Sequence, residues 1–316
     1  MCHGGADEKH NEFVIWSKKD FHTRAPATLT MARSARIAET LKIPDATTDA
    51  RCTVCHDSLQ AVPASRKGPL VSRAVEAVSC ESCHNAAEPW ILTHTRTDLT
   101  YQDKVNAGMR DLKNLYVRAN TCVACHQNLE PEIRAAGHPE LIFELDGQTV
   151  AMPRHWTETN RLRGAQAWFV GQAVALREGL AQLKVVPVAP SELAERAAAL
   201  AAILRLAADT DFVDQEARNV AERDWSRADT REHLRAIASQ SEWIPQGNAP
   251  SSQLPMRAER TVLALERLLV ALNLHQAPAL SSRLDTLFAD VQSRPDFDAP
   301  KFARDLKAFH DAITPE

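Results

Sequence analysis

The sequence predicts a mainly α protein in two parts: an irregular module over residues 1–156, followed by an α-helical bundle over residues 157–316. Three observations lead to this fold class. Three copies of one cysteine-containing pentapeptide fall in the first part, and that part has no long amphipathic pattern. In the second part, apolar residues recur at helical spacing over several segments.

The composition narrows the class of protein. A hydrophobic share of 44% and a charged share of 25% are those of a soluble globular chain, so disorder and collagen-like repeats are excluded. With 37 Lys and Arg against 41 Asp and Glu, the net charge of -4 argues against a nucleic-acid partner. The seven cysteines are an odd number and cannot all pair as disulfides within one chain.

Six of the cysteines belong to three copies of Cys-x-x-Cys-His. The copies are Cys52-Thr-Val-Cys55-His56, Cys80-Glu-Ser-Cys83-His84 and Cys122-Val-Ala-Cys125-His126. This run is the attachment signal of c-type haem, because the two thiols bond to the porphyrin vinyl groups and the adjacent imidazole binds the iron. A redox dithiol or half of a zinc site would explain one cysteine pair, but neither requires a histidine after every second cysteine. The motif therefore indicates three covalently bound haems.

The seventh cysteine starts a fragment of the same motif. Met1-Cys2-His3 is the second half of the pentapeptide, with its first cysteine missing, so we expect a fourth haem whose site is incomplete in this chain. The alternative is a chance Cys-His pair at a frayed terminus. Since the export signal and the first cysteine are both absent, the start of the chain looks trimmed or misassigned.

Other histidines are candidates for the second axial position of each iron. The candidates are His22, His94, His138 and His155, all within the first part. Gly137 and Pro139 suit a backbone that brings the imidazole of His138 close to a flat ring. His10 lies in a charged run and is expected to be a solvated surface residue. Three further histidines lie in helical sequence and are expected to be ordinary surface or core residues: His233, His275 and His310.

In these residues the sequence resembles the multihaem cytochromes of the cytochrome c-554 type, which are tetrahaem electron carriers. The matching stretches are MCHGG, NEFVIWSKKDFHTRA, CTVCH, VSCESCHNAAEPWILTH, TCVACH, AAGHPELIFEL and MPRHW, all within residues 1 to about 156. The resemblance implies thioether bonds at the six motif cysteines and proximal ligands at His56, His84 and His126. It also implies axial ligands at His22, His94 and His138. Two departures are the missing first cysteine and the lack of any further haem motif in residues 157–316.

The predicted elements follow from these assignments. In the first part we expect short helices around the motifs and within Thr28 to Lys42, with the porphyrins in the role of a hydrophobic core. In the second part a loop is predicted from Trp243 to Pro255. Helical segments are predicted over residues 161–184, 191–208, 213–239, 257–274, 280–292 and 299–312.

The leading functional hypothesis is a periplasmic electron-transfer protein whose haems are mostly bound by two histidines and exchange electrons with redox-partner proteins. Covalent haem attachment implies export. The sequence contains no run of eighteen apolar residues, so no membrane span is predicted. The alternative is an oxidoreductase that acts on a small nitrogen or sulfur species at a five-coordinate haem, with proton donors among Tyr101, Tyr116, Arg96 and Arg118. A third hypothesis makes the helical part a docking or oligomerisation platform, which is compatible with the first.

Overall fold

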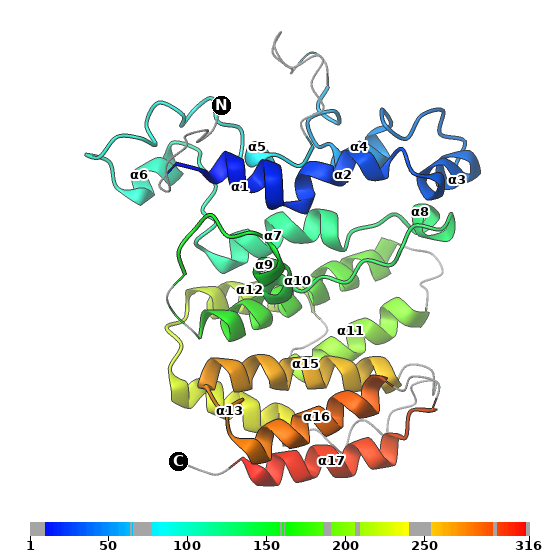
Figure 1. Ribbon diagram of the computed structural model, residues 1–316, viewed down its shortest axis with the longest axis vertical. Helices are drawn as coiled ribbons and strands as arrows, with labels where there is room; N and C mark the ends of the chain where they lie inside the picture. Colours follow the sequence, from blue (N-terminus) through cyan, green and yellow to red (C-terminus); the bar gives the residue numbers. More distant parts are fainter. Residues whose placement is uncertain are drawn as a thin grey trace. The chain divides into compact units, whose positions relative to one another are not determined.

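The computed structural model describes residues 10–63, 65, 77–158, 160, 162–185, 191–205, 209–239, 254–292 and 296–313. Within these ranges the chain forms helices and no strand, which confirms the mainly α class (Figure 1). Cys2 and His3 lie outside the described residues. The chain divides into two compact units, Met1–Phe143 with Gly147–Thr157, and Glu144–Asp146 with Glu158–Glu316.

The first unit contains short helices joined by irregular chain. They are α1 (Glu12–Lys19), the 3-10 helix η1 (Phe21–Arg24), α2 (Ala25–Thr28), α3 (Ala32–Thr40), α4 (Ala50–His56), α5 (Cys80–His84), α6 (Tyr101–Asn106), α7 (Leu115–His126) and α8 (Pro131–Ala135). The next helix, α9 (Leu145–Ala151), begins with residues that belong to the second unit. Helix α3 lies inside the segment predicted between Thr28 and Lys42.

Each complete Cys-x-x-Cys-His motif forms the end of a helix. Helices α4, α5 and α7 all terminate at the motif histidine, and a polar residue caps the start of each. The side chain of Asp49 accepts from the backbone N–H of Arg51, Ser79 forms a capping box, and Asn114 accepts from the first turn of α7. These caps fix where each motif helix starts, and hence where its cysteines and histidine project.

The first unit buries apolar side chains from several of its helices, among them Leu115, Val123 and Ile133. One of its clusters consists of Leu29, Ala38, Ile43 and Ala46. Several apolar residues near the motifs face outward instead, among them Phe21 at 74% exposure and Leu92 at 84%. Exposed apolar surface of this kind marks places that a further apolar group can cover.

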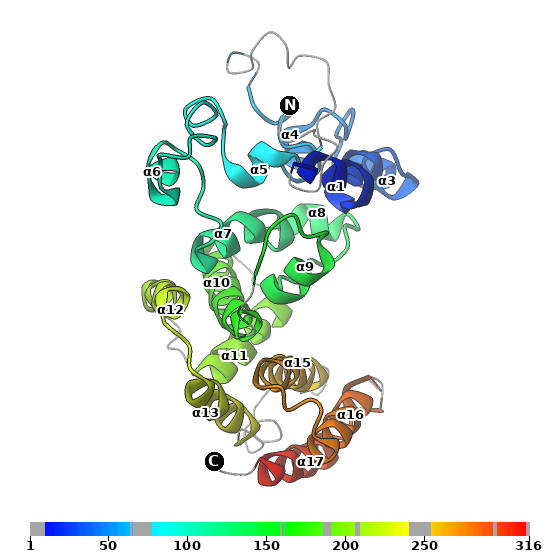
Figure 2. The same cartoon turned by 60° about the vertical axis from the view of Figure 1, so that its left-hand side comes forward.

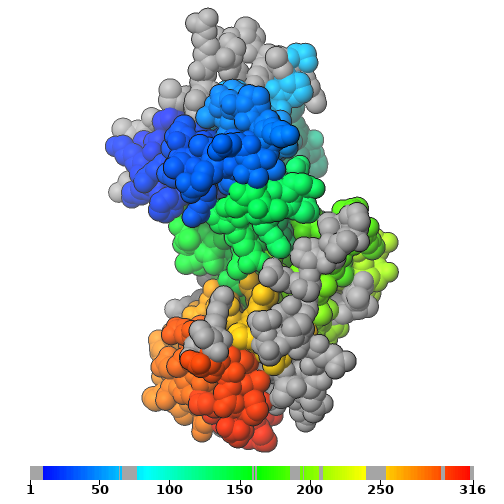
Figure 3. Space-filling model, turned by 90° about the vertical axis from the view of Figure 1, so that its right-hand side faces the viewer, coloured from blue at the N-terminus to red at the C-terminus, as the bar shows by residue number. Residues whose placement is uncertain are grey.

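The second unit consists of longer helices. They are α10 (Arg163–Val185), α11 (Ser191–Leu204), α12 (Thr210–Glu222), α13 (Arg227–Ala238), α15 (Leu254–Leu272), α16 (Pro278–Gln292) and α17 (Ala299–Ala312). Helices α15, α16 and α17 lie side by side (Figures 1 and 2). In the space-filling view, the orange and red residues of α16 and α17 form a shared surface (Figure 3).

Two predictions for this part need correction. Residues 213–239 form two helices rather than one, because Ser226 and Asp229 make a capping box that starts α13. The predicted loop from Trp243 to Pro255 is too long at its end, since α15 begins at Leu254, and proline is compatible with the first turn of a helix. Residues 243–253 of that loop lie outside the described residues, as do Pro187 and Pro190.

A continuous apolar core holds the second unit together. Its largest fully buried side chains include Trp168, Phe302 and Phe309, from α10 and α17. Leu265, Leu268 and Leu269 of α15 are also fully buried among them. The core comes from α10, α11, α13 and α15 to α17, which is the packing expected of a helical bundle.

No helix within the described ranges combines the length and the apolar character needed to cross a membrane.

Candidate functional site

Three pairs of histidines face each other in the first unit. The ring centroids of His22 and His126 are 6.0 Å apart, those of His56 and His138 are 6.4 Å apart, and those of His84 and His155 are 6.3 Å apart. Each pair joins one motif histidine at the end of its helix to one histidine from elsewhere in the unit. The structure therefore brings three of the four candidate axial histidines opposite a motif histidine.

This separation matches what one metal ion between two imidazoles requires. A metal–imidazole bond is about 2 Å long, which puts each ring centroid about 3 Å from the metal and two opposed rings about 6 Å apart. The three pairs thus fit an iron held by two axial histidines.

Hydrogen bonds at Nδ1 leave the other ring nitrogen available for a metal. His56 Nδ1 lies 3.1 Å from the carbonyl oxygen of Ala25 and 2.9 Å from the hydroxyl of Thr28, which itself donates to that carbonyl at 2.7 Å. His138 Nδ1 lies 2.8 Å from the carbonyl oxygen of Pro139. A carbonyl oxygen only accepts, so Nδ1 carries the proton and Nε2 keeps its lone pair. Burial lowers the pKa of both His56 and His126, which favours the neutral form that binds metals.

His22 differs in that a carboxylate holds its ring. Asp20 Oδ1 accepts from His22 Nδ1 at 2.9 Å and from the backbone N–H of His22 at 3.0 Å. Burial alone would raise the pKa of the Asp20 carboxyl, but the hydrogen bonds from His22 together outweigh it and the pKa is lowered. The side chain of Asp20 is therefore an ionised, buried acceptor beside one candidate ligand.

His126 has an amide partner. Gln148 on α9 places its Nε2 3.3 Å from His126 Nδ1, while its Oε1 is buried without a hydrogen-bond partner among the described residues. The same Nε2 also donates to the carbonyl oxygen of Ile142 at 3.3 Å, and a half-turn of the amide would replace this hydrogen bond with one from the ring to Oε1. A His126 ring that binds metal through Nε2 presents an N–H at Nδ1, and Oε1 is the acceptor it needs.

The remaining candidates have different surroundings. His155 Nδ1 is buried and has no hydrogen-bond partner among the described residues, although its ring faces His84. His94 packs edge-on against Trp90 at 5.5 Å, and its Nδ1 lies 2.6 Å from the carbonyl oxygen of Ile91. No contact recorded within the described residues sets His94 opposite a motif histidine. His10 is exposed, as expected of a surface residue.

Two of the motif helices, α4 and α7, are in contact at their motifs. Cys125 Sγ, from the second cysteine of the motif on α7, lies 4.0 Å from the carbonyl oxygen of Val54 within the motif on α4. Helix α7 is also tied to α5, because Arg110 donates to the carbonyl of Ser82 at 3.0 Å and to the hydroxyl of Thr121 at 3.3 Å. Helix α7 is therefore linked to both other motif helices.

The geometry gives no support to the other interpretations of the cysteines. None of the six described cysteines forms a disulfide. Within the described part of the chain, no three His, Cys, Asp or Glu side chains are grouped closely enough to hold one metal ion, so the cysteine pairs do not assemble a zinc site there. Burial raises the pKa of Cys83, and that of Cys122 to about 12, which keeps these thiols protonated at neutral pH.

The residues considered as proton donors are engaged in local contacts. Tyr101 donates its hydroxyl to Asp111 at 2.8 Å, and burial followed by this contact raises the pKa of Tyr101 to about 12. Arg96 pairs with Asp98, and Arg118 donates to the carbonyl of Leu112 at 2.7 Å. Tyr116 also makes contacts. These hydrogen bonds of Tyr101, Arg96 and Arg118 are thus made to groups within eleven residues along the chain.

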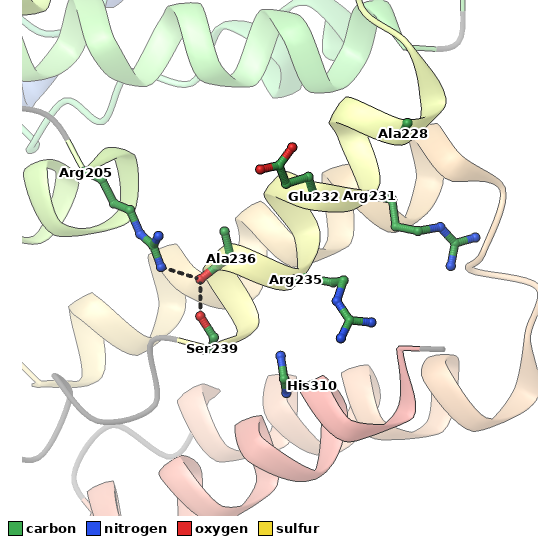
Figure 4. A pocket seen from close by; sticks show the side chains of 8 residues that line it. All are labelled: Arg205, Ala228, Arg231, Glu232, Arg235, Ala236, Ser239 and His310. Atoms are coloured by element: carbon green, nitrogen blue, oxygen red, sulfur yellow. Dashed lines mark hydrogen bonds between the residues drawn. The ribbon is translucent and has the colours of Figure 1, made fainter. Parts of the chain in front are cut away.

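A separate pocket of about 500 Å³ lies on the helical unit (Figure 4). It is lined by Arg205, Ala228, Arg231, Glu232, Arg235, Ala236, Ser239 and His310. Two of its cationic groups bind backbone: Arg205 donates to the carbonyl of Ala236 at 3.2 Å, and Arg235 to that of Ile313 at 2.7 Å. These arginines hold the ends of α13 and α17.

Sequence reasoning missed the residues that contact the candidate ligands. A carboxylate two residues before His22 was the available signal for Asp20, since an Asp side chain commonly bonds to groups two residues ahead. Gln148 gave no signal, because its contact with His126 depends on how α9 returns to α7. The same applies to the pairing of His155 with His84.

A comparison with known protein families finds a match at the start of the chain. Residues 1–85 match the family model described as cytochrome c554 and c-prime. The match includes the Cys2-His3 fragment and the motifs ending at His56 and His84, and it stops before the motif ending at His126. It confirms the resemblance of the N-terminal part of the chain to the cytochrome c-554 type. No curated protein and no solved structure matches the chain.

Proposed function

Starting from the match of residues 1–85 to the cytochrome c554 and c-prime family, we propose that this protein is a periplasmic multihaem cytochrome that passes electrons between redox-partner proteins. The observation that carries the proposal is the set of three facing histidine pairs at 6.0, 6.4 and 6.3 Å. Each complete motif then holds one haem through two thioether sulfurs and one proximal histidine. The periplasmic location follows from the export that covalent haem attachment requires.

The proposal gives each complete motif one candidate axial ligand. His138 serves the motif of His56, His155 serves the motif of His84, and His22 serves the motif of His126. His94 remains for the fourth haem, whose motif ends at His3, outside the described residues. A haem bound by two histidines supplies a one-electron couple and leaves no axial position for a substrate.

The protein's own groups place these sites next to one another. Because thioether bonds would fix each porphyrin to its motif helix, the contact of Cys125 with Val54 makes the groups of α4 and α7 neighbours. Arg110 joins α7 to α5 in the same way. Exposed apolar side chains such as Phe21 and Leu92 offer surface that flat apolar rings can cover. The arrangement favours electron carriage over the oxidoreductase alternative.

The proposal is tested on the holoprotein by intact mass and pyridine haemochrome titration. Three haems are expected on the three complete motifs, and a fourth when the chain is extended so that Cys2-His3 completes a motif. Fewer than three haems would contradict the proposal. Addition of cyanide or nitric oxide to the three-haem protein should leave the absorption spectrum unchanged, whereas a shifted spectrum would favour the oxidoreductase.

A further inference from the structure

Asp20 is placed to act on one iron more than on the others. It lies between α1 and η1, caps η1 through the backbone of His22, and is 5% exposed. Its Oδ1 contacts His22 Nδ1 at 2.9 Å. Among the described residues, its ion-pair partner is His22, and no Lys or Arg neutralises the carboxylate.

Other candidate ligands have neutral partners at the same ring nitrogen. His56, His94 and His138 turn Nδ1 to backbone carbonyls, and His126, opposite His22, turns it to the amide of Gln148. A carboxylate acceptor draws the Nδ1 proton more strongly than a carbonyl does, since charge-assisted hydrogen bonds are about twice as strong. It therefore makes the imidazole a stronger donor to a metal bound at Nε2.

We propose that Asp20 lowers the reduction potential of the haem held between His22 and His126. This inference rests on the function proposed above. A more electron-rich axial imidazole stabilises ferric iron over ferrous iron, and a buried negative charge nearby acts in the same direction. In the couple concerned, Fe(III) gains one electron to become Fe(II), and the Nδ1 proton stays in its hydrogen bond.

The charge of Asp20 also reaches the neighbouring centre. Asp20 interacts electrostatically with His155 and with Cys83, which belong to the site of the motif ending at His84. Because no hydrogen bond joins Asp20 to either ligand of that site, its effect there comes through space alone. The largest effect of Asp20 is thus at the His22–His126 centre, with a smaller effect of the same sign at the His84–His155 centre.

The test uses Asp20→Asn in the holoprotein. Asparagine caps a helix about as well as aspartate, so the substitution keeps the acceptor and removes the charge. Asp45→Asn is the matched control, because Asp45 also accepts from a backbone N–H two residues ahead, that of Thr47 at 2.8 Å, but is exposed and contacts no candidate ligand among the described residues. Asp20→Ser provides a second neutral cap if the amide disturbs η1.

Two measurements are needed: spectroelectrochemical titration of the haems, and electron paramagnetic resonance of the oxidised protein. We expect Asp20→Asn to shift one midpoint potential upward, a second by less, and to leave all irons low-spin, while Asp45→Asn leaves the titration as in the wild type. Unchanged potentials, or the same shift in both variants, would overturn the inference.

Loss of a low-spin signal in both Asp20 variants would also overturn it, since Asp20 would then hold the ligand in place rather than tune the iron. Failure of the proposed function is distinguishable from either result. It would be seen in the wild-type protein itself, as missing haems or as high-spin iron at the three complete motifs.

Discussion

The imidazole of His138 faces that of His56 across 6.4 Å, and the backbone just before His138 makes this possible. Gly137 adopts φ +106°, a conformation that side chains with a Cβ rarely take, and the following Pro139 provides the carbonyl that accepts from His138 Nδ1. The position of one candidate ligand therefore depends on the backbone conformation of the glycine before it.

Replacing that glycine should disturb the site through the backbone alone. A Cβ at Gly137 would meet no atom within 4 Å, so Gly137→Ala adds strain rather than a clash, at a cost of about 1–3 kcal/mol. We expect a lower melting temperature and partial loss of low-spin character at one haem. Gly164→Ala is the control, since a Cβ there also meets nothing within 4 Å and the backbone is helical. Equal melting temperatures and equal low-spin signals in the two variants would contradict this interpretation.

A different glycine tests the packing of the helical unit. A Cβ on Gly171 of α10 would lie 2.7 Å from Leu145 Cβ and 3.2 Å from the Leu145 backbone nitrogen, and Leu145 is fully buried. Gly171→Ala should therefore destabilise this unit by about 1–3 kcal/mol through overpacking. Urea unfolding followed by circular dichroism measures the change. A variant as stable as Gly164→Ala would show that Leu145 can move away freely.

The ion pair of Asp146 with Arg267 is buried, with 3% and 24% side-chain exposure. Arg267→Met leaves the carboxylate without its main partner and is expected to reduce the free energy of unfolding by about 3–5 kcal/mol. Lys307→Met breaks the exposed pair with Asp311 in α17 and should change the urea midpoint little. Similar losses in both variants would mean that burial does not decide the strength of these pairs.

His233 should make the helical unit sensitive to acid. Its ring packs against Phe169 and Trp225 at 4.8 and 5.3 Å, and burial, followed by the charge of Arg223, lowers its pKa. The folded state therefore favours the neutral ring. The contribution of the neutral His233 ring to the free energy of unfolding is fully present above the unfolded-state pKa of about 6.5. It falls as the pH drops below that value.

His233→Phe keeps an aromatic ring in this position and removes the titrating group. The variant should lose less stability between pH 7 and pH 5 than the wild type does, as measured by urea unfolding of the full chain at each pH. If both proteins lose stability by the same amount, His233 does not contribute to the acid sensitivity.

Much of the fold was predictable because its signals are local. Apolar spacing predicted the helices of the second unit, and short helices were predicted around the three motifs, where α4, α5 and α7 lie. The break between α12 and α13 was also encoded locally, in Ser226 and Asp229, but the charged residues around it hid it. Local signals are readable because each involves residues within one turn of a helix.

The pairing of the histidines was not predictable in the same way. His22 precedes all three complete motifs yet faces His126, the last of them, and His155 reaches back to His84. Such pairings depend on how separate segments return to one another, which no spacing along the chain specifies. The roles of Asp20 and Gln148 follow only once these pairs are known.

The most direct test of the account removes the facing histidines one at a time. His22→Ala, His138→Ala and His155→Ala are compared with His10→Ala, at an exposed position, by electron paramagnetic resonance of the oxidised holoproteins with spin quantitation. Each of the three variants should gain one equivalent of high-spin ferric haem relative to the wild type, and His10→Ala should gain none. Three variants that retain the wild-type low-spin spectrum would contradict the assignment of these pairs as haem ligands.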